Sequence, residues 1–258
     1  MIRKNLVCRF AFCVALAAPA AAWAAHPLIT DDTGTQGRGN FQLEVNGEYD
    51  HDKQYGITTT GKQADATLTY GIIDTVDVAI GIPYMWINTK SDDRHIDSSV
   101  NGFADATLDV KYRFVDMGGF SLAVKPGLNI PTGDSGEGLG AGKWGYHVYM
   151  IGTVETGPWT FLANLGYIRN DSDADTDENN IWHVSAAALY SLNNQWKIVG
   201  DLVAERNTDK DSDVNPVSAI AGVIYSPTKD IDLDLGIKAG LTSTATDWAF
   251  LAGTTFRF

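Results

Sequence analysis

Apolar and polar side chains alternate along most of this chain, and this period of two constrains the fold more than any other feature. In the segment 41–50, the residues Phe41, Leu43, Val45 and Tyr49 share one parity, and polar or charged residues occupy the other. Successive side chains of a β-strand point to opposite faces, whereas a helix would scatter this pattern around its axis. The alternation therefore predicts a strand with one apolar and one charged face.

The same pattern recurs often enough to account for the whole chain after its first 40 residues. Alternating segments follow at 64–70, 75–86, 103–114, 120–130, 144–155, 159–168, 182–190, 195–205, 216–225, 230–241 and 248–258. Most of them are near the ~10 residues that a tilted strand needs to cross a bilayer. We find no convincing helix, so the sequence predicts an all-β chain.

The connections between these segments alternate in length. Short connections lie at 71–75, 115–119, 155–158, 191–194 and 226–230, and long polar ones at 51–63, 88–101, 131–143, 169–180, 206–215 and 242–247. Outer-membrane barrels have short periplasmic turns and longer extracellular loops. We therefore predict a transmembrane antiparallel up-and-down β-barrel of about 12 strands over residues 40–258, located in the bacterial outer membrane.

A soluble β-sandwich is the main alternative fold, and the two faces of the strands disfavour it. A sandwich would bury the apolar faces against each other, but here the opposite faces carry many charges. In a barrel the apolar face meets lipid and the charges meet the lumen. Tyrosine and tryptophan near the strand ends fit two interfacial girdles: Tyr49, Tyr70, Tyr84, Trp86, Tyr112, Trp159, Tyr167, Trp182, Tyr190, Trp196, Tyr225 and Trp248.

The final segment, WAFLAGTTFRF (248–258), predicts how the barrel closes. We expect it to pair with the first strand, because a spanning sheet cannot leave an open edge in lipid. Phe256 and Phe258 would belong to the periplasmic girdle. The terminal Phe258 also resembles the signal that the outer-membrane assembly machinery reads, so that machinery is an expected partner, together with membrane lipid and lipopolysaccharide.

The first 24 residues have the features of a cleaved secretory signal peptide. Arg3, Lys4 and Arg9 precede or border a short apolar run, and Ala22-Trp23-Ala24 forms a small-residue cleavage site. We expect residues 25–39 to form a periplasmic N-terminal segment. Both cysteines lie within the predicted signal, so the mature barrel would have no disulfide.

The net charge of −13 and the pI near 4.6 exclude one class of partner. A nucleic-acid-binding surface needs a basic patch to neutralise phosphates, and none is visible. We expect no nucleic-acid partner and no cofactor.

Several segments resemble a known family. They are HPLITDDTGTQGRGNFQLEVNGEYDHD (26–52), LTYGIIDTVDVAIGIPY (68–84), FADATLDVKYRF (103–114) and PTGDSGEGLGAGKW (131–144). In this order they resemble the outer-membrane barrels described as "putative MetA-pathway of phenol degradation", over about residues 26–258. The resemblance implies an outer-membrane, transporter-like channel for small compounds, aromatic ones among them. It supplies no catalytic residues.

Charged and histidine side chains on the polar parity are the candidate pore lining. Acidic members are Glu44, Glu48, Asp65, Asp77, Asp105, Asp109, Glu155, Asp201, Glu205, Asp232 and Asp234, and the other members are Lys111, Arg113, Lys125, His147, His183, Lys197, Lys238 and Arg257. They could pair across strands and fill the lumen, or line a charged path that selects solutes. Twelve strands lie between filled eight-stranded barrels and open porins, so we expect a narrow, partly occluded pore.

Two loops carry weak motif signals. The glycine-rich loop 131–143 departs from a phosphate-binding loop at Glu137 and Trp144, so we expect it to fold over or into the pore mouth. The acidic stretch 171–178 lacks the glycine and glutamate of a calcium-binding loop, and Thr176 and Trp182 occupy those positions. A solvated acidic loop is favoured, and divalent cations bridging it to lipopolysaccharide remain an alternative.

Passive passage of small solutes is the function that these features favour. A non-conducting structural or adhesive surface barrel is the alternative. We expect no enzyme, because no nucleophile motif appears and the acidic neighbours of His51 and His95 are expected by chance in acidic loops. A barrel enzyme would need an Asp–His or Ser–His pair within hydrogen-bonding distance at the rim of the barrel.

Overall fold

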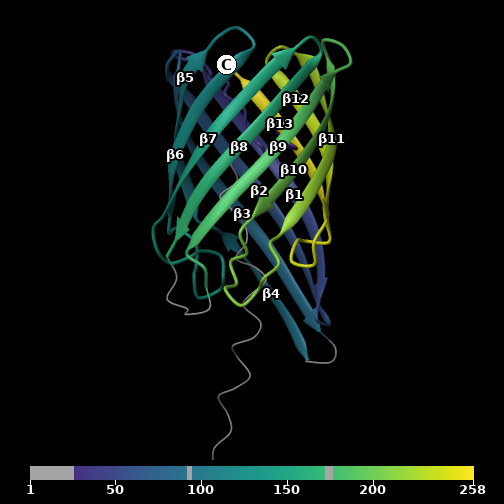
Figure 1. The fold of residues 1–258 in the computed structure, drawn as a ribbon. Coiled ribbons are helices and arrows are strands. Elements are labelled where there is room, and N and C mark those ends of the chain that lie inside the picture. Colours follow the sequence, from purple (N-terminus) through teal and green to yellow (C-terminus); the bar gives the residue numbers. More distant parts are fainter. Residues whose placement is uncertain (1–25, 92–94, 172–176) are drawn as a thin grey trace, which may run out of the picture.

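The computed structural model describes residues 26–91, 95–171 and 177–258, so the predicted signal peptide lies outside the described residues. Thirteen strands follow one another (Figure 1): β1 (Phe41–Gln54), β2 (Ile57–Ile73), β3 (Val76–Ser91), β4 (Ile96–Phe103), β5 (Ala106–Asp116), β6 (Phe120–Ile130), β7 (Gly145–Thr156), β8 (Trp159–Asn170), β9 (Asn180–Ser191), β10 (Trp196–Glu205), β11 (Val217–Thr228), β12 (Ile231–Gly240) and β13 (Trp248–Arg257). Among the described residues, no helix is long and apolar enough to span a membrane.

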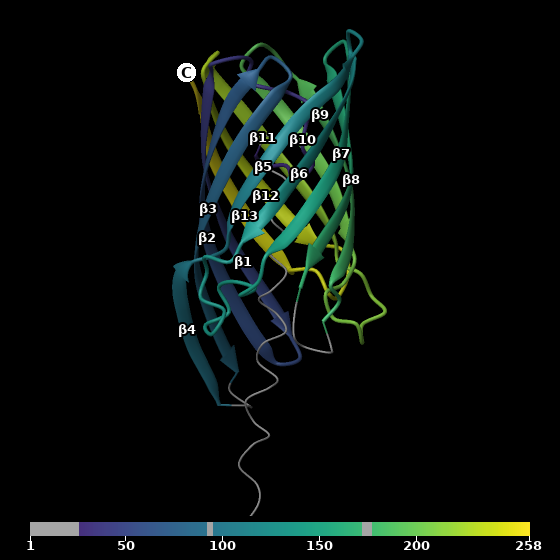
Figure 2. The ribbon, with the colours of Figure 1, turned by 90° about the vertical axis from the view of Figure 1, so that its left-hand side faces the viewer.

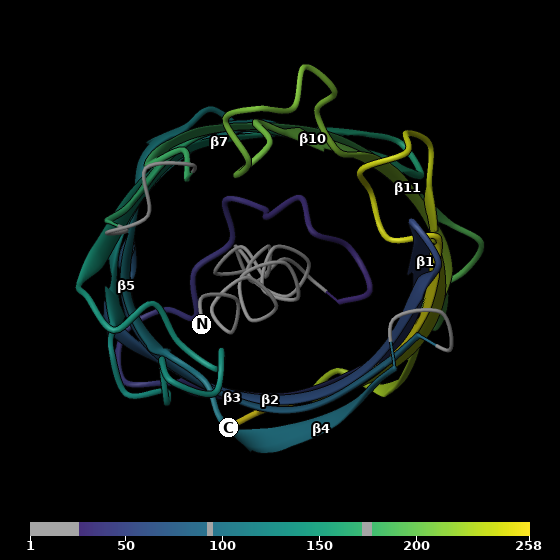
Figure 3. The ribbon, with the colours of Figure 1, turned by 90° about the horizontal axis from the view of Figure 1, so that it is seen from below.

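Twelve of these strands close into one antiparallel barrel, which confirms the predicted fold. The last strand pairs with the first, from Gln42↔Arg257 to His51↔Trp248, and β2 pairs with β3. Figure 3 shows the closed ring along its axis. Because every strand of the ring has two neighbours, the backbone groups within it are paired without an open edge, as a bilayer requires.

The strand β4 is the additional one, and it lies beside the outer half of β3. The near half of β3 pairs with β5 over Val76–Gly81, and the far half pairs with β4 from Tyr84↔Phe103 to Ser91↔Ile96. The predicted strand 103–114 is therefore interrupted between Phe103 and Ala106. In Figures 1 and 2 the β4 arrow extends away from the barrel on the long-loop side.

Two segments that the sequence analysis assigned to long loops are strands. The region 51–63 is a hairpin whose turn is only Tyr55-Gly56, both with positive φ, and most of the region 88–101 belongs to the β3–β4 hairpin. Both hairpins lie beyond the apolar band, so their strands carry Thr, Ser, Asn and Lys on both faces. A search for apolar alternation misses such strands, because they touch water on both sides.

The apolar parity faces outward, as predicted. Along β7, His147, Tyr149 and Ile151 are buried, whereas Val148 and Met150 are exposed. Aromatic rings gather near both ends of the wall: Trp159 stacks on Phe161 near the short turns, and Tyr49 contacts Trp248 near the long loops. An apolar band flanked by aromatic rings is the outer surface of a barrel that sits in lipid.

Candidate functional site

Residues 26–36, which precede the first strand, lie inside the barrel. Figure 3 shows their purple trace running within the ring, and Pro27, Leu28, Thr30, Asp31 and Thr33 are buried. The structure differs here from the expected periplasmic segment at 25–39. We call residues 26–36 the plug, since these residues occupy the lumen.

The chain enters the lumen at the short-turn end, where glycines allow a close approach. Gly39 N–H donates to Gly71 O at 2.8 Å, and Arg38 N–H donates to Asp74 Oδ1 at 3.1 Å. A Cβ on Gly71 would lie 1.8 Å from Gly37 O, so no larger residue fits this backbone crossing. The connection between plug and wall is thus fixed before the plug turns into the barrel.

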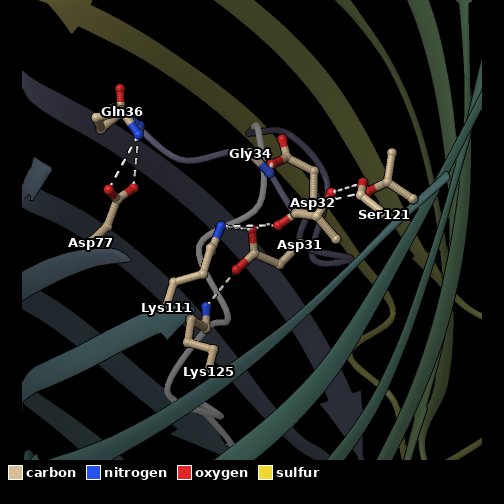
Figure 4. A network of polar contacts seen from close by, with 10 residues as sticks. Asp31, Asp32, Gly34, Gln36, Asp77, Lys111, Ser121 and Lys125 are labelled. Carbon is tan, nitrogen blue, oxygen red and sulfur yellow. Dashed lines mark hydrogen bonds and ion pairs between the residues drawn. The ribbon is translucent and has the colours of Figure 1, made fainter. Parts of the chain in front are cut away.

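Asp31 joins the plug to two adjacent strands of the wall (Figure 4). Lys111 Nζ of β5 donates to Asp31 Oδ1 at 2.8 Å, and Lys125 Nζ of β6 donates to Asp31 Oδ2 at 2.7 Å. Asp31 is 1% exposed and Lys125 is 3% exposed. Burial alone would raise the pKa of Asp31, which precedes the first spanning strand, but the two ammonium groups outweigh burial and hold this pKa below its ordinary value.

Lys111 and Lys125 need this counter-ion because of the strand register. They fall between the cross-strand pairs Asp109↔Gly127 and Tyr112↔Val124, so the two cations lie opposite each other. Like charges directly opposite on a sheet destabilise it. A single buried carboxylate between them satisfies both, and we call these three residues the latch.

A second anchor holds the plug to the other side of the barrel. Asp201 of β10 accepts from Ile29 N–H at 2.7 Å, from Thr30 N–H at 2.9 Å and from Thr30 Oγ1 at 2.5 Å. Here the wall supplies the charge and the plug supplies the donors. Buried backbone N–H groups that no strand can pair are satisfied in this way.

Further contacts continue this pattern around the lumen. Gln36 N–H donates to both oxygens of Asp77, and Thr33 N–H donates to Thr153 Oγ1 at 3.1 Å. Thr33 and Ser121 hydroxyls also hydrogen-bond, and His26 Nδ1 bonds Asp234. The plug is therefore held by many polar contacts.

One apolar contact accompanies them. Leu28 is 4% exposed and packs in a cluster with Leu162, Leu189, Val199 and Ile224, which face inward. The adjacent Pro27 lies against Gly222 and Gly236, where a Cβ on the first glycine would come within 2.6 Å of the proline ring. The start of the plug thus fits a recess in the wall.

Little free volume remains beside the latch. A cavity of about 50 Å³ is bordered by Asp31, Glu44, Asp77, Asp109 and Lys111, among others. Ligand sites usually enclose ~300–1,000 Å³, whereas a water needs only ~10–15 Å³ of such space. With the plug in position, this part of the lumen has room for a few waters and not for an organic solute.

A row of hydrogen-bonding side chains crosses the wall between the two anchors. His147 Nε2 of β7 lies 2.6 Å from Asp109 Oδ1 of β5, although β6 separates the two strands. They meet over Gly127, where a Cβ would lie 1.9 Å from Asp109 and 2.2 Å from His147. Gly127 therefore opens a gap between alternate strands.

A second glycine repeats this arrangement. Gly166 of β8 lies between Tyr149 and His183, and its Cβ would come within 2.5 Å of the tyrosine ring. His183 Nδ1 bonds Glu205 Oε1 at 2.6 Å, and His183 Nε2 lies 3.0 Å from Ser185 Oγ. Both an Asp–His pair and a Ser–His pair are therefore within hydrogen-bonding distance, inside the lumen.

The structure shows where the other predicted pore-lining residues lie. Asp77, Lys111, Lys125, Asp201 and Asp234 hold the plug, while Lys238 pairs with Glu48, Arg257 pairs with Asp232 at 2.7 Å, and Gln63 donates to Asp65 at 2.9 Å. Glu44 is buried beside the cavity, and Arg113 lies 3.7 Å from Asp116 at the short-turn end. Lys197 is exposed in an open hollow of about 550 Å³ at the same end.

Asp105 and the loop 131–143 form one unit. Asp105 accepts from Gly133 N–H at 2.9 Å and from Ala141 N–H at 2.8 Å, where the strand is interrupted between β4 and β5. Leu139 of the loop is 4% exposed, and a Cβ on Gly102 would lie 2.8 Å from it. The carboxylate thus fixes the loop to the wall.

The acidic loop falls partly outside the described residues. Residues 172–176 of the candidate calcium segment are not described. Asp177, which belongs to the same segment, forms a β-bridge with Asp209. Glu178 pairs with Arg206 at 2.6 Å. Within the described part of the chain, no cluster of three or more His, Cys, Asp or Glu side chains could hold a metal ion.

Sequence reasoning missed Asp31, Asn164, Ser185 and the two glycine gaps. The plug has no period of two, so its residues gave no strand signal. A signal for Asp31 did exist: the facing pair Lys111 and Lys125 demands an anion. It becomes visible only after the β5–β6 register is known.

Solved structures with the same fold are outer-membrane proteins. The COG4313 outer membrane channel from Pseudomonas putida F1 matches with a TM-score of 0.74 and 13% identity, covering 88% of this chain and 98% of that one. The NanC porin matches at 0.56 and 12%, covering 83% and 98%, and the KdgM porin at 0.52 and 10%, covering 84% and 99%. No curated protein sequence matches this chain.

With its closed ring and outward apolar band, the protein is an outer-membrane β-barrel. A family model matches residues 24–258, which is nearly the whole chain. The chain belongs to the family described as "Putative MetA-pathway of phenol degradation".

Proposed function

We propose that this barrel passes small solutes across the outer membrane, and that the plug gates the passage. The observation that carries the proposal is the latch, in which one plug carboxylate neutralises two facing wall cations. Such a contact is strong while it is dry and is lost when water enters. The plug can therefore leave its position without any change in the strand ladders of the barrel.

The family description and the solved channels with this fold also support the passage of small solutes. The family name points to phenol degradation, and the solved structures that share this fold include a channel and porins. We propose small organic compounds, aromatic ones among them, as the solutes. Passage of this kind requires no chemistry on the solute.

The charged wall would then select among solutes once the plug has moved. The predicted pore-lining residues, from Glu44 and Glu48 of β1 to Lys238 of β12, form this wall. We propose that outer-membrane lipid and lipopolysaccharide surround the barrel, and that the assembly machinery binds its closing strand.

Conductance in planar bilayers tests the proposal. We expect small, infrequent openings of the full chain, and large, frequent openings after deletion of residues 26–36. Liposome swelling with phenol, benzoate and a sugar of similar size then ranks the solutes. A folded deletion variant without openings at any voltage would instead support a non-conducting surface barrel, which the small cavity beside the latch favours.

A further inference from the structure

The wall of the lumen contains a serine, a histidine and a glutamate in a chain of hydrogen bonds. Ser185 Oγ lies 3.0 Å from His183 Nε2, and His183 Nδ1 lies 2.6 Å from Glu205 Oε1. With its proton on Nδ1, the imidazole donates to the glutamate and accepts from the serine. These are the relations of nucleophile, base and orienting carboxylate in serine hydrolases.

The strand register brings these side chains together. His183 and Ser185 are two residues apart on β9, so they share the inward face, and Glu205 of β10 is the direct cross-strand partner of His183. Tyr149 contacts the other side of the imidazole over Gly166, at 5.4 Å between ring centroids. The imidazole is therefore held from several sides, as a general base must be.

A fourth group lies opposite the serine. Asn164 of β8 is the direct cross-strand partner of Ser185, and its side chain is fully buried. Oriented to satisfy its neighbours, its amide nitrogen donates to Asp31 O at 3.0 Å and to Ala163 O at 2.9 Å, and its oxygen accepts from Asp31 N–H at 2.6 Å. When the plug leaves, the N–H that is directed at Asp31 O loses this partner, while the bond to Ala163 O stays within the wall. A side-chain amide in this position is a donor for an oxyanion.

We propose that Ser185, His183, Glu205 and Asn164 form an acyl-transfer site for small esters, masked by the plug. The plug carbonyl of Asp31 occupies the amide donor that would hold the carbonyl oxygen of an ester. Ser185 is 3% exposed in this state, so the masked site is closed to substrate. Removal of the plug uncovers the nucleophile and frees the oxyanion donor together.

The reaction balances with water as the only co-reactant. Ser185 Oγ bonds to the ester carbonyl carbon while its proton passes to His183 Nε2, and the Asn164 amide stabilises the oxyanion. The ester C–O bond then breaks, and the departing alcohol takes the proton from His183. Water next attacks the acyl-serine, giving its proton to His183, and the released acid leaves Ser185 Oγ to regain that proton.

A fluorescent alkyl fluorophosphonate tests the nucleophile, with peptide mass spectrometry to locate the label. The purified full-length chain in detergent micelles should react slowly, and the plug-released variant Asp31→Asn at least tenfold faster, at Ser185. Ser185→Ala should abolish the label, and Glu205→Gln should slow it about a hundredfold because the imidazole loses its orienting anion. Ser226→Ala is the matched control. This inward serine bonds Asp232 and has no histidine among its partners in the described residues, so labelling should be unchanged.

Turnover of p-nitrophenyl acetate separates the oxyanion donor from the nucleophile. In the Asp31→Asn background, Asn164→Leu should lower kcat ~10²–10³-fold and leave KM nearly unchanged. If KM rises by as much as kcat falls, or if kcat does not change, Asn164 is not part of the site.

Conductance of the same samples shows whether the plug has moved. If the plug has not moved in Asp31→Asn, the variant that lacks residues 26–36 is used in its place. Raised conductance without label at Ser185 overturns the acyl-transfer site and leaves the proposed passage intact. Label at Ser185 without raised conductance supports the site and counts against the passage. Absence of both in the deletion variant overturns both proposals.

Discussion

Substitution of Asp31 by asparagine is the sharpest perturbation of the plug, because it keeps the shape of the side chain and removes its charge. Lys111 and Lys125 then face each other in the wall without their shared anion. Removing one partner of a buried ion pair costs about 3–5 kcal/mol, since the other charge stays buried without compensation. Asp32 and Glu44 also interact electrostatically with Lys111, which favours the lower end of that range.

This cost falls on the closed state alone. Once the plug leaves, water reaches both ammonium groups, so the substitution changes the open state little. Each 1.36 kcal/mol corresponds to a factor of ten, so the ratio of open to closed barrels should rise about 150-fold to a few thousandfold. We expect frequent openings where the unmodified chain opens rarely.

Single-channel recording in planar bilayers measures that ratio directly, as the fraction of time spent open. Asp32→Asn is the matched control, because it removes the same charge one residue away. The Asp32 carboxylate accepts from Gly34 N–H within the plug at 2.6 Å. It interacts electrostatically with Lys111 but makes no described bond to the wall, so its loss should raise the open fraction less than the loss of the Asp31 charge. An open fraction for Asp31→Asn no higher than for Asp32→Asn would refute the latch.

Three further predictions test the acid response, the glycine gap and the closing strand. The pKa of the Asp31 carboxyl is lower in the closed state than after release of the plug. The ionised carboxylate therefore stabilises the closed state fully above the released pKa, and this stabilisation is lost as pH falls through the closed-state pKa. Conductance should rise below about pH 3.8 in the unmodified chain, and no such rise should occur in Asp31→Asn. Gly127→Ala places a methyl 1.9 Å from Asp109 and should lower the free energy of unfolding by ~1–3 kcal/mol. The loss should appear as a lower midpoint temperature of the heat-induced gel-mobility shift. Gly200→Ala is the control, because its Cβ would have its nearest neighbour at 3.9 Å and the midpoint should not change. Deletion of Phe258 removes the backbone bonds and ring that join the last residue to the first strand, so the yield of folded barrel in membranes should fall, and an unchanged yield would count against this role.

The sequence was sufficient to predict the barrel, because the alternation of apolar and polar residues is a local property of each strand. A strand between lipid and lumen must alternate, and β7 does so residue by residue, with His147 and Tyr149 inside and Val148 and Met150 outside. The sequence did not predict the hairpin extensions of β1–β4, because strands that meet water on both faces need no alternation of apolar residues. Alternation therefore reports the surroundings of a strand as much as its backbone.

The pairing of lumen charges could not be predicted in the same way. Which charges meet depends on the register of each strand pair and on gaps such as Gly127, and neither is a local property. Parity predicted that Asp109, His147 and His183 face inward, but not that Asp109 crosses a whole strand to reach His147. The same holds for Ser185, which gained a possible role only through its distance to His183.

The plug and the wall are held by different interactions, and this difference permits the plug to move while the wall stays intact. The wall is held by strand ladders that close on themselves, and no single contact opens them. The plug is held by short polar contacts between its own donors or carboxylate and charges such as Asp201 and Lys125, together with one small apolar recess around Leu28. Polar contacts of this kind are replaced by water at modest net cost, whereas broken strand pairs in lipid are not. A solute or proton that competes for a few wall charges could therefore release the plug while the barrel remains closed.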